Sequence, residues 1–434
     1  MKDFIIFYEH KSRELENAVL LSLYLENKGY TVDILHVDSW KMLYKRTKAV
    51  ITPYAYSDLD VFSFTFFPFC KVKKCINMQY EQLFTQEDEE SGAFYPKGSA
   101  KCCDIICWGA ESSKALSLHG VPRRRIHEVG QVAMDFNCKS FSSYLLSRNY
   151  ISKKYGIPYQ MKWNLFISSF SYSNLYEAQK KNIQSMVGSI DEMIKLSVDS
   201  QMRVLEWFKK YLSNHKNDCI IYRPHPSEQL IKPIVELTNK YSNFYVIDDY
   251  SIRQWIGVCD SISTWYSTSV ADVYFAGKKC AILRPIPIPV KKELCIMREA
   301  ELITDYGRFS EYMEDECKQS FPISEDVMRR YYSNSISGGC GRKLADECIS
   351  ILKDKRNHVN YVKKSKMKWK NKILRVIWIG LMCVGEKIDL SHILPEKYKA
   401  QAHYVFKESR GAKGDILSYR KRIERLVKSE LCDS

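Results

Sequence analysis

The sequence predicts an α/β fold of two successive Rossmann-like domains, followed by a basic helical tail. Three observations support this fold class. The chain has 434 residues, whereas single hydrophobic cores stop growing near ~250–300 residues. Short apolar strands alternate with helices in two separate runs, and strands connected in this way pair into parallel sheets. The last segment differs from both runs because it is strongly basic.

The first domain, predicted over residues 1–150, begins with a strand, a helix and a second strand. Phe4–Tyr8 is continuously apolar, Gly29 ends the helix, and Tyr30–Val37 forms the next strand. The helix carries apolar residues at helical spacing: Leu15, Val19, Leu20, Leu23 and Tyr24. The alternation continues through Asp60–Phe69, Lys74–Phe84 and Cys103–Asp135. A polar stretch within Ser140–Gln160 then predicts the domain boundary.

The second domain, predicted over residues 151–355, repeats the alternation. A helix is expected around Val204–Leu212, and another begins near Pro233, because proline suits the first helical position. The expected strands are Trp163–Ser171, Asp218–Pro224, Phe244–Asp249, Asp260–Trp265 and Lys279–Pro285. This half therefore shows the same Rossmann-like pattern as the first.

The tail, predicted over residues 356–434, contains a basic and aromatic stretch at residues 361–385. The stretch has no acid and carries seven cations, which are Lys363, Lys364, Lys366, Lys368, Lys370, Lys372 and Arg375. Its apolar run Ile373–Val384 is shorter than the ~20 residues that cross a bilayer. One interpretation is an interfacial amphipathic segment on an anionic membrane surface. The other is a helix that packs back across the domains with solvated lysines, and the sequence favours neither.

Composition and motifs narrow the function. Lys and Arg number 66 against 51 Asp and Glu, a net charge of +15 that favours anionic partners. Nucleic acid is not expected, because the excess cations gather in the tail and not in a recognisable binding module. The 15 cysteines lack zinc-site spacing, so no metal is expected. Without a Walker-type or GxGxxG motif, no ATPase, NAD enzyme or cofactor is indicated. A cytosolic chain with reduced thiols is expected, because the N-terminus shows no signal-peptide pattern.

The first candidate element is "RPHPSE", which contains His225 directly after a predicted strand. Ligands of open α/β sheets bind beyond the carboxyl ends of the strands. Pro224 and Pro226 restrict the backbone on both sides, so the imidazole is presented in a fixed direction. His225 and Arg223 could then donate hydrogen bonds to a phosphate. The alternative, favoured for a single histidine, is a rigid turn in which the ring satisfies a backbone carbonyl.

The second candidate element is a hydroxyl-rich loop after a later strand of the same half. Its three successive hydroxyls belong to Ser267, Thr268 and Ser269. A helix is expected to follow, ended by Gly277. Backbone N–H groups and hydroxyls at a helix start can bind an anion, although helix capping accounts for one hydroxyl. Three hydroxyls in the same half as His225 favour a phosphate site.

The third candidate element, "YEHKSRELE", follows the first strand of the chain. Its polar members are Glu9, His10, Arg13 and Glu14, and Glu81 follows another strand of the same half. These residues are expected at the mouth of a cleft between the domains. A carboxylate there could act as the general base that deprotonates an acceptor hydroxyl. The alternative for each carboxylate is a solvated charge in a loop or at a helix start.

These elements resemble a group of bacterial surface-carbohydrate biosynthesis proteins, which are glycosyltransferase-like and have the two-Rossmann GT-B architecture. The similar stretches are "YEHKSRELENAVLLSLYLENKGYTVDIL", "CDIICWGAESSKALSLHGVPRRRIHEVGQVAMD", "YRPHPSE" and "CDSISTWYSTSVADVYFAGKKCAIL", which cover most of residues 1–290 but not the tail. The His-Pro and Ser-Thr-Ser elements are also similar to those of sialyl-, polysialyl- and Kdo-transferases. That similarity implies that His225, Pro226 and the three hydroxyls hold the nucleotide of a CMP-sugar.

The sequence departs from those transferases in one motif. Their acidic-acidic-glycine motif, which provides the base, has no match, because Asp248 and Asp249 are followed by Tyr250 and lie in the second half. Polyol-phosphate transferases that use CDP-glycerol or CDP-ribitol are similar too, and share an equivalent His-Pro histidine. UDP-GlcNAc 2-epimerases share the fold and transfer no sugar. A non-catalytic scaffold of a glycan assembly complex is the remaining alternative.

The resulting hypothesis is a metal-independent GT-B glycosyltransferase of capsule or lipopolysaccharide synthesis, with a cleft between its domains. We expect a CMP- or CDP-linked donor in the second domain, where His225 stabilises the leaving phosphate. We expect Glu9 or Glu14 to be the base and the acceptor to be a glycan or a lipid-linked glycan. The protein is expected in the cytoplasm, peripheral to the inner face of the membrane through residues 361–385.

Overall fold

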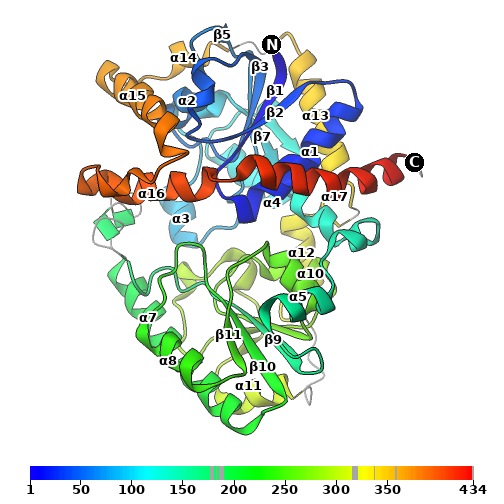
Figure 1. The fold of residues 1–434 in the computed structure, drawn as a ribbon. Helices are drawn as coiled ribbons and strands as arrows, with labels where there is room; N and C mark the ends of the chain where they lie inside the picture. The colour runs from blue at the N-terminus through cyan, green and yellow to red at the C-terminus, as the bar shows by residue number, and fades with distance from the viewer. Residues whose placement is uncertain are drawn as a thin grey trace. The chain divides into compact units, whose positions relative to one another are not determined.

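Two units make up the chain, and each is built around one six-stranded parallel sheet (Figure 1). The computed structural model describes residues 1–175, 180–181, 183–184, 190–314, 321–336, 338–356 and 359–432. Unit 1 consists of Met1–Gln82, Phe94–Asp135 and Arg329–Ser434, and unit 2 consists of Leu83–Ala93 and Phe136–Met328. The predicted class of two Rossmann-like α/β domains with a helical C-terminal segment is confirmed.

The sheet of unit 1 has the strand order β2-β1-β3-β6-β7-β8, with every neighbouring pair parallel. Its strands are β1 (Lys2–Tyr8), β2 (Val32–His36), β3 (Thr47–Thr52), β6 (Lys74–Asn77), β7 (Asp104–Cys107) and β8 (Ile126–Glu128). A short antiparallel pair, β4 (Phe66–Phe67) and β5 (Cys70–Lys71), lies outside this sheet. Strand β3 was not predicted from the sequence, because polar residues flank its apolar core of only three residues.

Most of the described helices of unit 1 come from its C-terminal segment, Arg329–Ser434, which also covers one earlier helix. The helices of this unit include α1 (Glu16–Asn27), α2 (Asp58–Thr65), α4 (Ala110–Leu118), α13 (Cys340–Lys353), α14 (Tyr361–Lys364), α15 (Trp369–Gly385), α16 (Glu396–Ser409) and α17 (Ala412–Cys432). A helix with apolar residues on all sides must be covered by protein on the face that points away from the sheet. Buried α1 receives this cover from α13 and α17, which both pack against it.

The sheet of unit 2 has the order β11-β10-β9-β12-β13-β14, again entirely parallel. Its strands are β9 (Lys162–Ile167), β10 (Asp218–Arg223), β11 (Phe244–Val246), β12 (Ser261–Thr264), β13 (Cys280–Leu283) and β14 (Leu302–Ile303). Its helices include α3 (Gln86–Ser91), α5 (Arg148–Tyr155), α7 (Asp191–Asn214), α8 (Lys232–Lys240), α9 (Ile252–Val258), α10 (Val270–Phe275) and α11 (Tyr306–Met313), and α12 (Glu325–Tyr332) runs into unit 1. This is the strand order of a classical dinucleotide-binding sheet.

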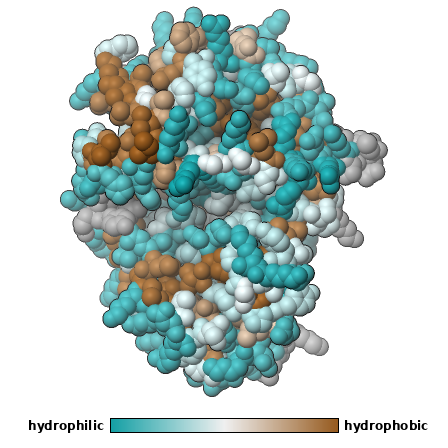
Figure 2. Space-filling view, in the orientation of Figure 1, coloured by the Kyte–Doolittle hydropathy of each residue, from teal (hydrophilic) through white to brown (hydrophobic). Residues whose placement is uncertain are grey.

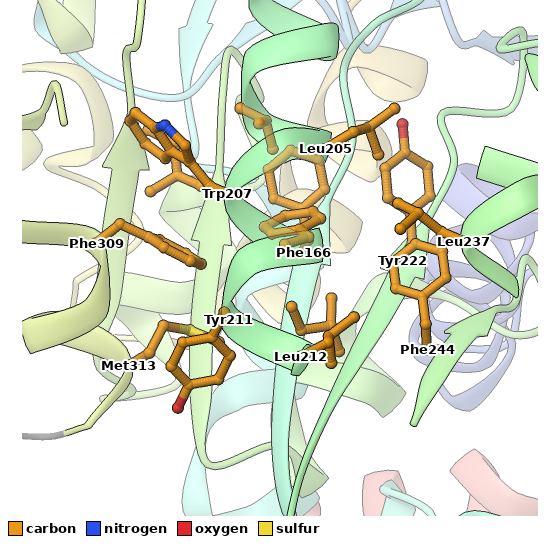
Figure 3. Packing of buried hydrophobic residues seen from close by; sticks show 14 of the residues in the cluster. Phe166, Leu205, Trp207, Tyr211, Leu212, Tyr222, Leu237, Phe244, Phe309 and Met313 are labelled. Atoms are coloured by element: carbon orange, nitrogen blue, oxygen red, sulfur yellow. The ribbon is translucent and has the colours of Figure 1, made fainter. Parts of the chain in front are cut away.

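A largely aromatic core holds the long helix α7 against the sheet of unit 2 (Figure 3). Phe208 of α7 meets Phe166 of β9 edge to face, with ring centroids 5.1 Å apart. Trp207, also on α7, packs on Phe309 of α11 with centroids 5.7 Å apart. Aromatic pairs of this geometry add to the free energy gained from burial. The core therefore fixes β9 and β10, whose carboxyl ends carry the candidate residues.

The division of the chain differs from the predicted ranges 1–150, 151–355 and 356–434. Residues 136–150 belong to unit 2, where the Phe136 ring packs on Tyr144 and lies under the Arg253 guanidinium. Residues 329–434 belong to unit 1. The buried Asp135 carboxylate accepts hydrogen bonds from the Cys340 and Gly341 N–H groups, at 2.9 and 2.7 Å, and so binds the start of α13. The domain boundaries therefore depend on contacts between residues far apart in the chain, which local composition cannot predict.

Candidate functional site

Each sheet has a topological switch point, where successive strands begin to be added on the other side of the first strand. Ligands of open α/β sheets bind at this point, beyond the carboxyl ends of the strands. In unit 2 this point lies between β9 and β12, and in unit 1 between β1 and β3. His225 follows β10, next to β9, and Ser267 to Ser269 follow β12. Glu9 and His10 follow β1, and Glu81 follows β6. The predicted residues thus lie at the carboxyl edges of their sheets.

The His225 ring is held by its own loop. Its Nδ1 lies 2.8 Å from the Ser227 hydroxyl and accepts the Ser227 backbone N–H at 3.2 Å. Because a backbone amide can only donate, Nδ1 must be the unprotonated nitrogen of a neutral ring. The ring proton is then on Nε2, which is the donor nitrogen. The fixed direction predicted from the flanking prolines is therefore accompanied by a fixed tautomer.

Glu228 joins the loop after β10 to the loop after β9. Its carboxylate accepts hydrogen bonds from the His225 N–H at 3.1 Å and from the Ser168 hydroxyl at 2.5 Å. It also accepts from the Tyr222 hydroxyl and from the Gln201 amide at 3.1 Å. Burial raises the pKa of Glu228, and the bonds from Ser168 and Tyr222 oppose that shift. A buried network whose members are all paired makes the loop rigid.

The hydroxyl-rich loop after β12 is tied to the same place. Ser169, next to Ser168 at the end of β9, accepts the Tyr266 N–H at 2.8 Å. The Ser267 hydroxyl accepts the Ser269 N–H at 3.2 Å, which forms a local turn. Helix α10 has only six residues, and Ser269 makes no side-chain cap bond. Gly277 follows its end with a φ of +62°, as predicted for a helix terminator. The loops after β9, β10 and β12 therefore form one connected edge.

Arg223 and Pro226 occupy different positions in this edge. The buried Arg223 guanidinium donates to the backbone carbonyls of Asp249, at 2.7 Å, and of Tyr250. Tyr250 has a φ of +64°, a strained conformation for a residue other than glycine. Arg223 thus braces the loop after β11, and its predicted contact with the donor stays a prediction. Pro226 is exposed at the tip of the His225 loop.

In unit 1 the predicted polar residues come together in one loop. The Glu14 carboxylate accepts the Glu9 N–H at 2.6 Å and the His10 N–H at 3.4 Å. Arg13 pairs with Glu81, 2.6 Å from guanidinium nitrogen to carboxylate oxygen, and so links the loop after β1 to the segment after β6. Glu14 accepts both backbone amides through its Oε2, whereas the Glu9 carboxylate lies 4.0 Å from His10 Nε2. Glu9 therefore suits a reactive role better than Glu14.

Burial strongly perturbs both carboxyl groups. It raises the pKa of Glu9 to about 8, and the neighbouring Glu14 adds to the shift. Burial also raises the pKa of Glu14, to about 7, although Arg13 and the two backbone N–H groups oppose it. A carboxyl group with a pKa near neutrality can accept and return a proton in the physiological range. The pair has the electrostatic character of a general base.

Helix α16 supplies a residue to this loop that the sequence analysis did not consider. The Tyr404 hydroxyl donates to the Glu9 carbonyl at 3.0 Å and lies 3.0 Å from His10 Nδ1. The Lys11 N–H donates to the Glu408 carboxylate at 2.7 Å, and the Tyr8 hydroxyl to the Glu408 carbonyl at 3.1 Å. Residues separated by almost 400 positions share no local signal. Ser168 and Ser169 were also missed, because the predicted strand Trp163–Ser171 included them, whereas β9 ends at Ile167.

No metal centre is visible in the described part of the chain. There, no group of three or more His, Cys, Asp or Glu side chains is arranged to hold a metal ion. Besides Arg223 and Glu228, which bind other parts of the protein, the polar groups at the unit 2 edge are hydroxyls, an imidazole and backbone amides. Such groups can stabilise a leaving phosphate by hydrogen bonding. The expectation of a metal-independent reaction stays a prediction.

Comparison with known proteins supports the fold. No family model and no curated protein sequence matches the chain. Among solved structures, the wall teichoic acid polymerase TagF, soaked with CDPG, is similar with a TM-score of 0.53 and 11% identity, covering 81% of this chain and 88% of that one. The UDP-GlcNAc 2-epimerase of Methanocaldococcus jannaschii, in complex with UDP-GlcNAc and UDP, reaches 0.50 at 10% identity, covering 81% and 100%. This chain therefore has a GT-B-like fold.

Proposed function

We propose that the protein is a glycosyltransferase of bacterial surface-polysaccharide synthesis that uses a nucleotide-activated sugar, with a CMP-sugar as the favoured donor. The observation that carries the proposal is the connected edge of unit 2, where His225 and a hydroxyl-rich loop lie at the carboxyl ends of β10 and β12. The similarity to TagF, solved after a soak with CDPG, and to a UDP-GlcNAc 2-epimerase, solved with UDP-GlcNAc and UDP, supports such a donor.

The donor phosphate is proposed to bind at that edge. His225 would donate from Nε2 to a phosphate oxygen, and the hydroxyls of Ser267, Thr268 and Ser269 would add further donors. When the bond between the sugar and the phosphate oxygen breaks, negative charge collects on the leaving CMP. Donors that are already oriented stabilise that charge without reorganising. Glu228 would keep the His225 backbone in place.

The acceptor is proposed to bind at the loop after β1 in unit 1. The ionised Glu9 carboxylate would take the proton of an acceptor hydroxyl while the oxygen of that hydroxyl forms a bond to the anomeric carbon of the donor sugar. Glu14 would position the loop through the Glu9 and His10 amides. The acceptor is proposed to be a glycan or a lipid-linked glycan, with the protein in the cytoplasm and residues 361–385 on an anionic membrane.

A second candidate reaction is the transfer of a polyol phosphate from a CDP-polyol. The similarity to a wall teichoic acid polymerase favours this alternative. In that reaction the acceptor oxygen attacks phosphorus, the phosphoanhydride bond breaks, and CMP leaves. His225 would again face the leaving phosphate. An epimerase of the UDP-GlcNAc type, by contrast, would act on its sugar nucleotide with no acceptor present.

A nucleotide panel tests the proposal on the full chain. We expect CMP and CDP to raise the melting temperature more than UDP and GDP do, and His225→Ala to weaken that effect without changing the melting temperature of the free protein. With a CMP-Kdo, CMP-sialic acid and CDP-glycerol donor set, His225→Ala should lower kcat by about 100-fold or more, the usual cost of one lost oxyanion donor. A preference for UDP or GDP would reject the cytidine donor, and wild-type turnover by His225→Ala would reject the role of the histidine.

A further inference from the structure

Helix α15 has apolar side chains on two opposite faces. One face, with Ile379 and Met382, is buried within unit 1. The other is exposed, and we call it the α15 stripe. Its members are Trp369, Ile373, Leu374, Ile377, Leu381 and Val384, which are 43% to 73% exposed. Figure 2 shows hydrophobic side chains gathered over α15. Exposed apolar surface that is continuous in this way marks an interaction site.

The α15 stripe is one continuous surface along the helix. Its positions recur at intervals of three and four residues, so at 3.6 residues per turn they occupy an arc of roughly 140°. The buried residues occupy the opposite arc. The helix has 17 residues, and is therefore shorter than the ~20 residues that cross a bilayer. No helix in the described part of the chain is long and apolar enough to span a membrane.

Exposed cations flank the α15 stripe at both ends. Those at the start are Lys363, Lys364, Lys366, Lys368 and Lys370, and Lys387 lies beyond the other end. Residues 361–385 contain no acid. Lysines beside an apolar helical face are typical of helices that lie in the headgroup region of anionic membranes. A second copy docked in parallel on the stripe would place these five lysines against five lysines.

The orientation of the α15 stripe is fixed by polar contacts on the buried side. The Arg375 guanidinium pairs with the Asp38 carboxylate and donates to the Val37 carbonyl at 3.2 Å. The Glu386 carboxylate accepts from the Ser39 hydroxyl at 2.8 Å and from the Trp40 indole N–H at 3.2 Å. The first half of the helix and its C-terminal end are therefore attached to the segment after β2. The stripe cannot turn inward without breaking these bonds.

We propose that the α15 stripe docks on the surface of an anionic lipid bilayer, with the helix lying in the plane of the interface. The apolar side chains would enter the upper acyl region, and the lysines would meet the headgroup phosphates. This inference specifies the membrane contact of the proposed function, and rests on that function only for the lipid-linked nature of the acceptor. The sequence predicted an interfacial amphipathic segment within residues 361–385, and the structure specifies which of its apolar side chains are exposed.

The bilayer contact is linked structurally to the acceptor loop. Asp38 binds Arg375 of α15 with one carboxylate oxygen and accepts from the Gln401 amide of α16, at 3.2 Å, with the other. Helix α16 also carries Tyr404, which contacts Glu9 and His10. A helix seated on the bilayer would therefore hold the acceptor loop beside the membrane. This placement suits an acceptor whose lipid remains in the bilayer.

Vesicle binding by the full chain tests the proposal. We expect sedimentation with vesicles of phosphatidylcholine and phosphatidylglycerol, weaker binding to phosphatidylcholine alone, and weaker binding at high salt. The double variant Ile377→Asp, Leu381→Asp should bind the mixed vesicles with an affinity lower by roughly 10-fold or more. The reason is that binding would no longer transfer these two apolar side chains from water into the bilayer. Leu118→Asp, on the exposed side of α4, is the matched control and should bind as the wild type does.

Two further measurements separate the outcomes. Brominated lipids should quench the fluorescence of Trp369, and Trp369→Phe should remove that part of the quenching. Cytidine nucleotides should still stabilise the double variant, so a failure of donor binding is distinguishable from a failure of docking. Unchanged vesicle binding by the double variant would overturn the proposal. So would a dimer in lipid-free solution that the double variant makes monomeric, because a second copy would then cover the stripe.

Discussion

At the scale of single residues, Glu9 combines partial burial, a neighbouring carboxylate and a position at the carboxyl edge of β1. Its raised pKa of about 8 has a direct kinetic consequence. A general base must be ionised, so we expect kcat/KM to rise with pH through about 8. Glu9→Gln should lower kcat by roughly 100-fold or more and abolish this dependence. The pH profile of transferase activity is the measurement.

Glu14 provides the control for that assignment. Glu14→Gln removes a negative charge beside Glu9, which contributes to the raised pKa. The rise in activity should therefore move to lower pH in this variant, while it disappears in Glu9→Gln. A wild-type pH profile in Glu9→Gln would show that another group is the base. His10 would then be the first candidate, because its Nε2 lies 4.0 Å from the Glu9 carboxylate.

At the scale of elements, α16 acts on the acceptor loop through one hydroxyl. Tyr404→Phe removes the hydrogen bond to the Glu9 carbonyl and the contact with His10 Nδ1, but keeps the edge-to-face ring packing on His10. One hydrogen bond is worth ~1 kcal/mol, so kcat/KM for the acceptor should fall by roughly 5-fold. The KM for the donor should stay unchanged. Steady-state kinetics with both substrates varied is the measurement.

The control for Tyr404 lies on the same helix. Tyr398→Phe alters a tyrosine of α16 that is 37% exposed, and its kinetics should match those of the wild type. Tyr404 is a positioning residue, so its loss should also displace the pH at which activity rises. Equal losses for both substrates and both variants would mean that α16 contributes only to folding.

The ends of strands were predicted from the sequence better than the lengths of helices or the hydrogen-bond partners of side chains. His225 and the hydroxyl-rich loop were located correctly because an apolar strand followed by polar or proline-rich residues is a local pattern. Helix α10 proved to have only six residues. Glu228 was not singled out, since its donors come from the loop after β9, from β10, from α7 and from its own loop. Such networks depend on tertiary contacts that no single stretch contains.

At the scale of the whole molecule, the C-terminal segment is a structural part of unit 1. Helix α17 buries Ile423 and Val427, and Arg420 pairs with Glu26 of α1. The sequence left open whether the tail meets a membrane or packs back on the domains. The structure shows packing on unit 1, together with an exposed apolar stripe on α15. Both interpretations are therefore compatible, on different faces.

A partly buried ionic cluster attaches α13 to the sheet of unit 1, and we expect it to make stability depend on pH. His127 of β8 lies 3.3 Å from the Asp104 carboxylate and 2.7 Å from that of Glu347 on α13. Burial opposes protonation, but the bonds to Asp104 and Glu347 outweigh it and raise the pKa of His127 to about 9. Between about pH 6.5 and pH 9 the folded state therefore keeps a proton on His127 that the unfolded chain, with a histidine pKa of about 6.5, has already released.

The sign of the effect follows from this difference in proton binding. The stabilisation by His127 should be fully present below about pH 6.5 and lost as the pH rises through about 9. His127→Gln should be less stable than the wild type near pH 6, by on the order of 2 kcal/mol, and the difference should vanish above about pH 9. Urea unfolding across this range is the measurement, with His392→Gln, at an exposed histidine, as the control. A difference that is independent of pH would mean that His127 stabilises unit 1 by packing alone, because only a titrating ring can lose its contribution in this window.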